Sequence, residues 1–179
     1  GQVKTGRTHL MDAMPIDFSD ELLAWSSQLN ASRKMLSVID ERFLELPQGG
    51  TAVGSGINAH KQLAKIFAQE LTKLSGSNCK CVPSSNFFHE LSAQDCSVQL
   101  SGELKNLAVI LMKISNDLRW MNSGPLAGLS EIELQALQPG SSIMPGKVNP
   151  VIPEAVTMVA ADVIGNDVSI TVAAQAGNF

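Results

Sequence analysis

Two runs of apolar residues recur at heptad spacing, and this pattern constrains the fold more than any other feature of the chain. In the first run, one apolar series repeats every seven residues and a second series follows three residues behind it. The first series is Leu22, Leu29, Leu36 and Phe43, and the second is Trp25, Ser32, Ile39 and Leu46, with Ser32 as its polar exception. The spacing predicts one long helix that opens with Ser19 as its N-cap and ends at the Gly-rich stretch 46–56.

Three more helices are predicted from apolar spacing, over 59–74, 100–121 and 151–172. The middle one has the most regular pattern, with apolar residues alternately four and three apart: Leu100, Leu104, Leu107, Leu111, Ile114, Leu118 and Met121. The last one is apolar on most sides, so we expect it to be buried among other helices. Residues 75–86 are expected to form a loop. No alternating strand pattern is found, and the predicted fold class is all-α, a bundle of long antiparallel helices.

Heptad helices of this length have too few partners within 179 residues. Their apolar stripes therefore indicate further helices, supplied either by other subunits or by more of the same polypeptide. The apolar ending "AAQAGNF" carries no polar tail. From these features we expect the chain to be part of a larger assembly and of a longer protein.

Composition and charge disfavour several classes of protein. A net charge of -4 without any run of like charges argues against nucleic-acid binding. No apolar stretch approaches the roughly 18 residues of a membrane span, and the first residues do not resemble a signal peptide. The odd count of three cysteines indicates reduced thiols and a cytoplasmic location, or a mitochondrial one if the source is eukaryotic.

Two familiar kinds of site fail on spacing. Cys79, Cys81, Cys96 and His89 could be imagined around zinc, but a single residue separates the first two and structural ligands are usually two to four apart. We therefore predict no metal. The stretch 49–58 loosely matches a dinucleotide fingerprint, yet no strand precedes it and no acidic residue follows at the required distance. A nucleophile elbow is also missing from the sequence.

The loop from Pro139 to Pro150, "PGSSIMPGKVNP", places one lysine among glycines, prolines and serines. It is not a Walker A loop, because five residues separate its glycines and Val148 follows Lys147. Its composition alone is equally compatible with a plain surface turn. Thr8 and His9 in "GRTHLMDAMP" are similarly ambiguous, since a histidine in this context is often only packed.

The quoted motifs resemble a known family. "GSSIMPGKVNP" is similar to the signature of the fumarase/aspartase superfamily, and "GRTHLMDAMP", "GGTAVGSGIN" and "NDLRWMNSGPLAGLSEI" resemble the class II fumarases in particular. Aspartases typically carry glutamine where His9 stands. The likeness extends along essentially the whole chain. It implies a hydratase that interconverts fumarate and malate without metal or organic cofactor, and a homotetramer whose active sites each draw loops from three subunits.

The resemblance also implies roles for residues of this chain. Ser141 would take a proton from the carbon next to a carboxylate, while Lys147 and Asn149 would stabilise the aci-carboxylate that forms. His9 would serve the hydroxyl that leaves as water, with Glu154 polarising its imidazole. The implied substrate-binding set is Thr8, Ser142, Lys147, Val148 and Asn149. Without the resemblance, Glu154 is equally explained as an acidic residue that complements a helix N-terminus.

The chain departs from the family pattern in two places and in length. "NFFHE" has His89 where fumarases commonly carry glutamate, and Leu126 stands where many carry arginine. The N-terminal substrate-binding region and the C-terminal domain of relatives have no counterpart, so we expect residues 1–179 to be the central helical domain, inactive by itself. Two alternatives stay open: an aspartate ammonia-lyase of the same superfamily, and a non-enzymatic helical scaffold.

Overall fold

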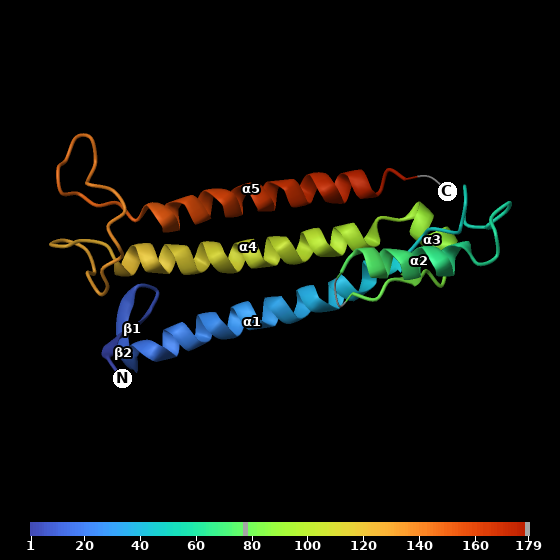
Figure 1. Cartoon of the computed structure of the whole chain (residues 1–179). Coiled ribbons are helices and arrows are strands. Elements are labelled where there is room, and N and C mark those ends of the chain that lie inside the picture. Colours follow the sequence, from blue (N-terminus) through green and yellow to red (C-terminus); the bar gives the residue numbers. More distant parts are fainter. Residues whose placement is uncertain (77–78, 178–179) are drawn as a thin grey trace. The chain divides into compact units, whose positions relative to one another are not determined.

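The computed structural model describes residues 1–76 and 79–177 and is mainly helical (Figure 1). Ser77 and Asn78 of the predicted loop, and the apolar end at Asn178 and Phe179, lie outside the described residues. The described chain forms two compact units, 1–32 with 105–165 and 33–104 with 166–177. Three long helices each contribute a part to both units. The bounds of these helices are α1 Phe18–Arg42, α4 Asp95–Met121 and α5 Val151–Ala174.

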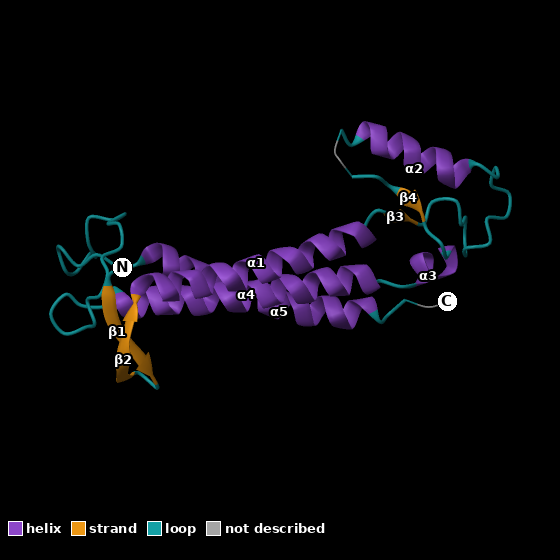
Figure 2. Cartoon of the chain, turned by 90° about the horizontal axis from the view of Figure 1, so that it is seen from below, coloured by secondary structure: helices purple, strands orange, loops and turns teal. Residues whose placement is uncertain are grey.

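The first unit begins with an antiparallel hairpin, β1 Val3–Thr8 and β2 Met11–Asp17 (Figure 2). The unit continues with the first part of α1, the second part of α4, the segment 122–150 and most of α5. Within the unit α4 lies beside α1 and runs antiparallel to it, and Lys113 Nζ lies 5.9 Å from the centre of the Trp25 ring (Figure 1). The hairpin contradicts the expectation that the chain holds no strands.

The second unit contains the remaining parts of the long helices and four short elements. These are β3 Glu45–Leu46, α2 Leu63–Leu74, β4 Val82–Pro83 and α3 Phe87–Ser92. The strands β3 and β4 pair in parallel. An all-α fold is therefore confirmed only as a mainly helical one. In this unit a hydrogen bond of 2.8 Å joins Ser101 of α4 to Asp167 of α5, so these parts of the two helices lie side by side.

The predicted helices agree with α1, α2, α4 and α5 to within five residues, whereas α3 was not predicted from the sequence. Two of the deviations have local causes. α1 begins at Phe18 and not after Ser19, because Asp17 Oδ1 accepts hydrogen bonds from the backbone N–H and the hydroxyl of Ser19. These two bonds also lower the pKa of Asp17. α2 begins at Leu63 and not at residue 59, since a turn precedes it with Leu63 N–H bonded to His60 O.

Each long helix buries a stripe with a period of seven. On α1 this stripe is the second predicted series, whereas on α4 and α5 it is not a stripe of large apolar residues. Buried positions of this period are Trp25, Ser32 and Ile39 on α1, Ser101, Ala108 and Ser115 on α4, and Pro153, Ala160 and Asp167 on α5. Leu22, Leu29 and Phe43 of the predicted seam stay exposed. Small residues at the buried positions allow the helices to approach closely. With few helices in each unit, the broader apolar faces are left uncovered.

α5 does not lie buried among helices as expected, because Met158, Val159 and Val168 are each more than 60% exposed. The statement that no stretch is long and apolar enough for a membrane span is also wrong. In the part of the chain that the structure describes, α5 is the one helix that passes this test of length and composition. Core helices of soluble proteins pass the same test. The prediction that the protein does not enter a membrane stays a prediction.

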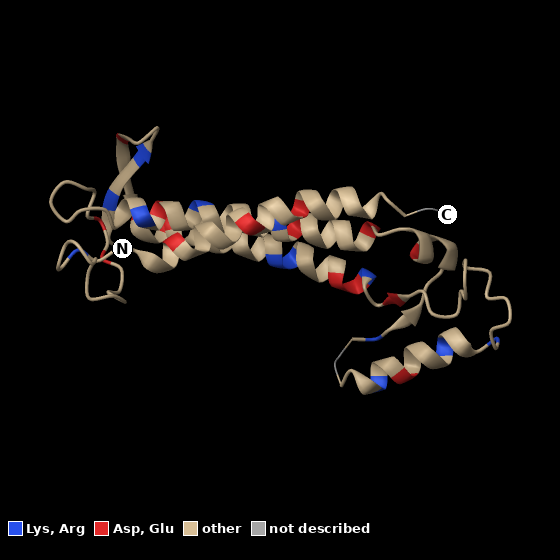
Figure 3. Cartoon of the chain, turned by 90° about the horizontal axis from the view of Figure 1, so that it is seen from above, with Lys and Arg blue, Asp and Glu red and all other residues tan. Residues whose placement is uncertain are grey.

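Charged residues of both signs are interspersed along the helices (Figure 3). This distribution agrees with the low net charge of the sequence. The prediction that the protein does not bind nucleic acid stays a prediction.

Candidate functional site

Thr8 and His9 lie at the end of the hairpin, in a turn with an unusual backbone. Thr8 pairs with Met11, so that His9 and Leu10 form a two-residue turn. Their φ angles are 54° and 62°, and both residues therefore adopt the left-handed conformation of a type I′ turn. Gly is common at such positions because it lacks a Cβ, and Asn because its short polar side chain can form local hydrogen bonds. The turn presents the His9 side chain to the exterior of the unit.

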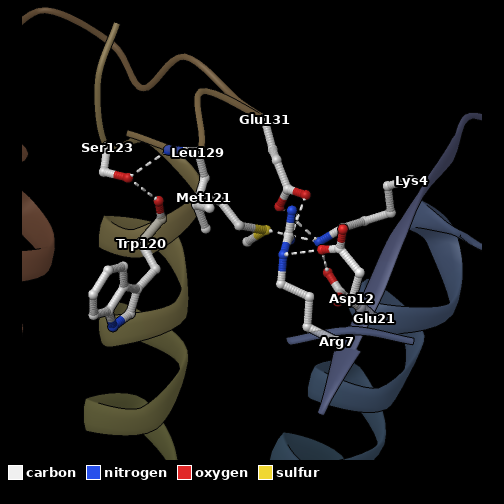
Figure 4. A network of polar contacts seen from close by, with 9 residues as sticks. All are labelled: Lys4, Arg7, Asp12, Glu21, Trp120, Met121, Ser123, Leu129 and Glu131. Carbon is white, nitrogen blue, oxygen red and sulfur yellow. Dashed lines mark hydrogen bonds and ion pairs between the residues drawn. The ribbon is translucent and has the colours of Figure 1, made fainter. Parts of the chain in front are cut away.

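A cluster of four charged residues joins this hairpin to α1 and to the segment after α4 (Figure 4). We call it the Glu131 cluster, and its members are Lys4, Arg7, Glu21 and Glu131. Arg7 Nη1 donates to Glu131 Oε1 over 2.6 Å, and Lys4 Nζ lies 3.0 Å from Glu131 Oε2. Lys4 Nζ also donates to Glu21 Oε2 over 2.7 Å. Glu131 accordingly holds two cations of β1.

The charges of the Glu131 cluster stabilise one another. Burial alone would raise the pKa of Glu131, but hydrogen bonds from Arg7 and Lys4 outweigh burial and bring the pKa below its ordinary value. Burial likewise opposes the charged form of Lys4, while Glu21 and Glu131 raise the pKa of its ammonium above the ordinary value. The pKa shifts of Glu131, Lys4 and Arg7 therefore all favour the charged forms, and none of the four residues of the cluster was among the site residues predicted from the sequence.

A cavity of about 380 Å³ lies next to this cluster. His9 and Leu10 line it from the hairpin, and Lys113, Asp117 and Trp120 line it from α4. The imidazole of His9 thus borders a space that is rich in charged groups.

The loop predicted from Pro139 to Pro150 is closed on itself by backbone contacts. Gly140 and Pro145 form an isolated antiparallel bridge, and Lys147 N–H bonds to Met144 O over 3.2 Å. Gly140 has a φ of 130°, and a Cβ there would lie 2.9 Å from the backbone nitrogen of Gly146. A glycine is therefore required at this position.

Ser141 lies inside this loop, and its hydroxyl is already engaged. Ser141 Oγ accepts a hydrogen bond from Met144 N–H over 2.9 Å. A fixed N–H donor stabilises an oxygen that carries negative charge, which is the environment a serine needs in order to act as a base. Ser142 is exposed beside it.

Lys147, Val148, Asn149 and Glu154 are brought together at one cavity of about 520 Å³. Lys147 Nζ donates to Asn149 Oδ1 over 2.8 Å, so that the lysine and the amide form one polar pair. Glu154 is half-buried in the first turn of α5, and its N–H bonds to Pro150 O. A cation, an amide and a carboxylate at one cavity can bind an anionic substrate and exchange protons with it.

Sequence reasoning missed the contribution of α4 to this cavity. Asn116, Arg119 and Trp120 line its other side, and Arg119 Nη1 donates to Asn116 Oδ1 over 3.0 Å. The signal was present in the motif "NDLRW", which was used for the resemblance but not for the site.

The predicted site residues do not form one cluster within the chain. His9 lines a different cavity from Glu154, and in residues 1–76 and 79–177 no hydrogen bond or ion pair joins the two side chains. The expectation that Glu154 polarises the imidazole of His9 stays a prediction, as do the roles of the other site residues. The Gly-rich stretch 49–58, which loosely matches a dinucleotide fingerprint, belongs to the second unit.

The cysteines do not indicate a metal site. Cys79 is exposed, and Cys81 and Cys96 are half-buried. His89 Nε2 instead lies 2.8 Å from Asp95 Oδ2, linking α3 to the start of α4. Within the described residues, no group of three or more His, Cys, Asp or Glu side chains could hold a metal ion.

Known proteins with similar sequences are class II fumarate hydratases. One from Pseudomonas aeruginosa is 60% identical over 99% of this chain, which covers 38% of that protein. One from Bacillus subtilis is 48% identical over the same share of the chain. The chain thus spans less than two fifths of the length of the curated relatives that it matches.

Solved structures show the same likeness. A class II fumarase from Schistosoma mansoni superimposes with a TM-score of 0.95 at 37% identity, over 98% of this chain and 40% of that chain. A protein described as fumarate lyase:delta crystallin from Brucella melitensis gives a TM-score of 0.92 at 45% identity, over 98% of this chain and 38% of that one. The resemblance to class II fumarases that the motifs indicated is confirmed. Because the model of the family described as lyase matches residues 2–165, this chain belongs to that family.

Proposed function

We propose that this chain is the central helical part of a fumarate hydratase that interconverts fumarate and malate. The observation that carries the proposal is the cavity at which Lys147, Asn149 and Glu154 meet, at the base of the loop that holds Ser141. The names of the similar proteins support it, because those proteins are fumarate hydratases.

The proposed reaction requires chemical groups of the kind that line this cavity. Dehydration of malate begins with loss of a proton from a carbon beside a carboxylate, and the second negative charge that develops must be stabilised as it forms. Lys147 and Asn149 supply a cation and an amide for that charge. Ser141 would accept the proton, aided by the N–H of Met144.

Departure of the hydroxyl as water requires an acid, and we assign this step to His9. Thr8, Ser142 and Val148 would line the substrate beside it. His9 and Glu154 border different cavities of one chain, and the pair would then form between subunits. The uncovered apolar face of α5 supports such an assembly, because exposed apolar surfaces of this extent drive association.

We further propose that the active protein is longer than this chain and that it is a homotetramer located in the cytoplasm. The relatives are more than twice as long, and their additional parts would supply the remaining substrate ligands. The odd count of three cysteines suits a reducing compartment.

The full-length protein tests the catalytic proposal directly. We expect absorbance of fumarate to appear when malate is added, and no comparable ammonia release from aspartate. Dominant ammonia release would identify an aspartate ammonia-lyase instead. Absence of both activities in a correctly assembled protein would favour a structural scaffold.

Assembly can be tested separately by light scattering at several concentrations. Val159→Lys should lower the molecular mass of the assembly in solution, because it places a charge on the exposed apolar face of α5 that we expect to be covered by another subunit. The matched control is Leu126→Lys, at a residue that is 98% exposed outside the helices. A wild-type protein that is monomeric at all concentrations would contradict the tetramer.

A further inference from the structure

We propose that Glu131 is a positioning residue for His9, which fixes the end of the hairpin at the geometry the acid–base step requires. The proposal rests on the proposed function, because it assumes that His9 takes part in the chemistry. Glu131 itself does not touch the reacting atoms in this proposal; it acts through Arg7, two residues before His9 in the chain.

Glu131 is firmly attached to the end of α4. Its backbone N–H bonds to Met121 O over 2.8 Å, and the N–H of Ile132 bonds to the same oxygen over 3.2 Å. Leu134 N–H bonds to the side chain of Asn122 over 2.8 Å. These bonds tie the segment after α4 to the helix, so that the Glu131 carboxylate starts from a fixed backbone.

The end of the hairpin needs such an anchor, because its strand ladder is interrupted. The register of β1 and β2 shifts between Thr5 and Arg7. Gly6 lies at this irregularity, where a Cβ would come within 2.7 Å of Met14 O. The regular pairing from Val3 to Thr5 therefore does not by itself fix the pairs Arg7–Asp12 and Thr8–Met11 that carry the turn.

The turn is also unfavourable by itself. His9 and Leu10 both have left-handed backbones without being glycine, and such conformations persist only where the surrounding structure holds them. The contact nearest to the turn within the Glu131 cluster is the 2.6 Å bond from Arg7 Nη1 to Glu131 Oε1. Asp12, the other carboxylate near Arg7, is 3.8 Å away and largely exposed, so it is a weak substitute.

The Arg7–Glu131 ion pair is largely shielded from water, so water cannot readily replace either partner. The side chain of Glu131 is 15% exposed and that of Arg7 is 21% exposed. Arg7 makes the shorter contact with this carboxylate, 2.6 Å to Oε1, whereas Lys4 Nζ lies 3.0 Å from Oε2 and is shared with Glu21. Loss of the Glu131 charge would leave Arg7 without its close partner and release the turn beside His9.

The experiment uses the full-length protein with Glu131→Gln, which keeps the size of the side chain and removes its charge. The matched control is Glu133→Gln, two residues further along on the same segment and exposed. We expect Glu131→Gln to lower kcat about 10- to 100-fold, because small displacements of a reacting group cost that much. We also expect it to shift the limb of the pH–rate profile that His9 controls.

Arg7→Gln should reproduce both effects, and the double variant should be no worse than either single one, since the two residues act as one unit. If Glu131→Gln fails to fold, Arg7→Lys serves in its place, because it keeps the charge but loses the planar donor geometry. We then expect the kcat of Arg7→Lys to lie between that of the wild type and that of Arg7→Gln.

The inference is overturned if Glu131→Gln lowers the melting temperature but leaves kcat and the pH–rate profile of the folded fraction unchanged. In that case the Glu131 cluster only stabilises the fold. A wild-type protein without hydratase activity would instead contradict the proposed function, so the two failures are distinguishable.

Discussion

Ser101 Oγ on α4 donates a hydrogen bond of 2.8 Å to Asp167 Oδ1 on α5, and both residues are buried. They stand at equivalent places in the seven-residue stripes of their helices. A polar pair at such a position disfavours alternative alignments of the two helices, because any other alignment would leave a buried carboxylate without this donor.

Removal of this donor should therefore destabilise the chain. We expect Ser101→Ala to lower the free energy of unfolding by about 1–3 kcal/mol, the usual cost of depriving a buried polar group of a hydrogen bond. Urea unfolding followed by circular dichroism measures the change. Ser97→Ala, at an exposed position one turn earlier on the same helix, is the control. Equal midpoints for the two variants would show that the pair contributes nothing.

His9→Asn tests the acid–base role in the full-length protein. We expect kcat to fall by about two orders of magnitude or more, which is the typical contribution of general acid–base catalysis. The melting temperature should not fall, because the side chain is exposed and asparagine readily adopts the left-handed backbone of this turn. His60→Asn, at another exposed histidine, should leave both quantities unchanged. Near-normal turnover with a lowered melting temperature would mean that His9 is structural.

The turn conformation can be tested at Leu10. A β-branched side chain is especially unfavourable in the left-handed region, so Leu10→Ile should destabilise the turn by about 1–2 kcal/mol. Met11→Ile adds the same side chain at the neighbouring residue of β2, where an extended backbone accepts it. Thermal unfolding compares the two variants. If Met11→Ile costs as much as Leu10→Ile, backbone conformation is not the cause.

The pKa of Glu131 predicts a dependence of stability on pH. Since the folded state lowers this pKa below its ordinary value of 4.5, the unfolded state binds the proton more readily in the acidic range. The stabilisation is complete above pH 4.5 and is lost as the pH falls through the lowered pKa. We expect the difference in unfolding free energy between wild type and Glu131→Gln to shrink in that acidic range.

Lys4 provides the opposite limb of the same test. Its pKa is raised above 10.5, so its contribution is complete below that pH and disappears as the pH rises through the raised value. Chemical unfolding at a series of pH values measures both limbs. A difference between wild type and Glu131→Gln that stays constant down to strongly acidic pH would contradict the charge-based account.

The sequence by itself determined the long helices and the content of the signature loop. A period of seven is a local property that any stretch of chain displays without its partners, so α1, α4 and α5 could be located from spacing. The residues from Ser141 to Glu154 are near neighbours in the chain, so the grouping of Lys147, Asn149 and Glu154 at one cavity follows from local geometry.

Only the tertiary structure decided which stripe of each helix is buried, where the hairpin forms and what holds it. The hairpin was missed because His9 and Leu10 give no turn signal, and their left-handed backbones depend on distant contacts. The bond from Arg7 to Glu131 joins residues 124 positions apart. Such a pair leaves no periodic trace in the sequence, because charged residues separated by that distance meet only when the fold brings their elements together.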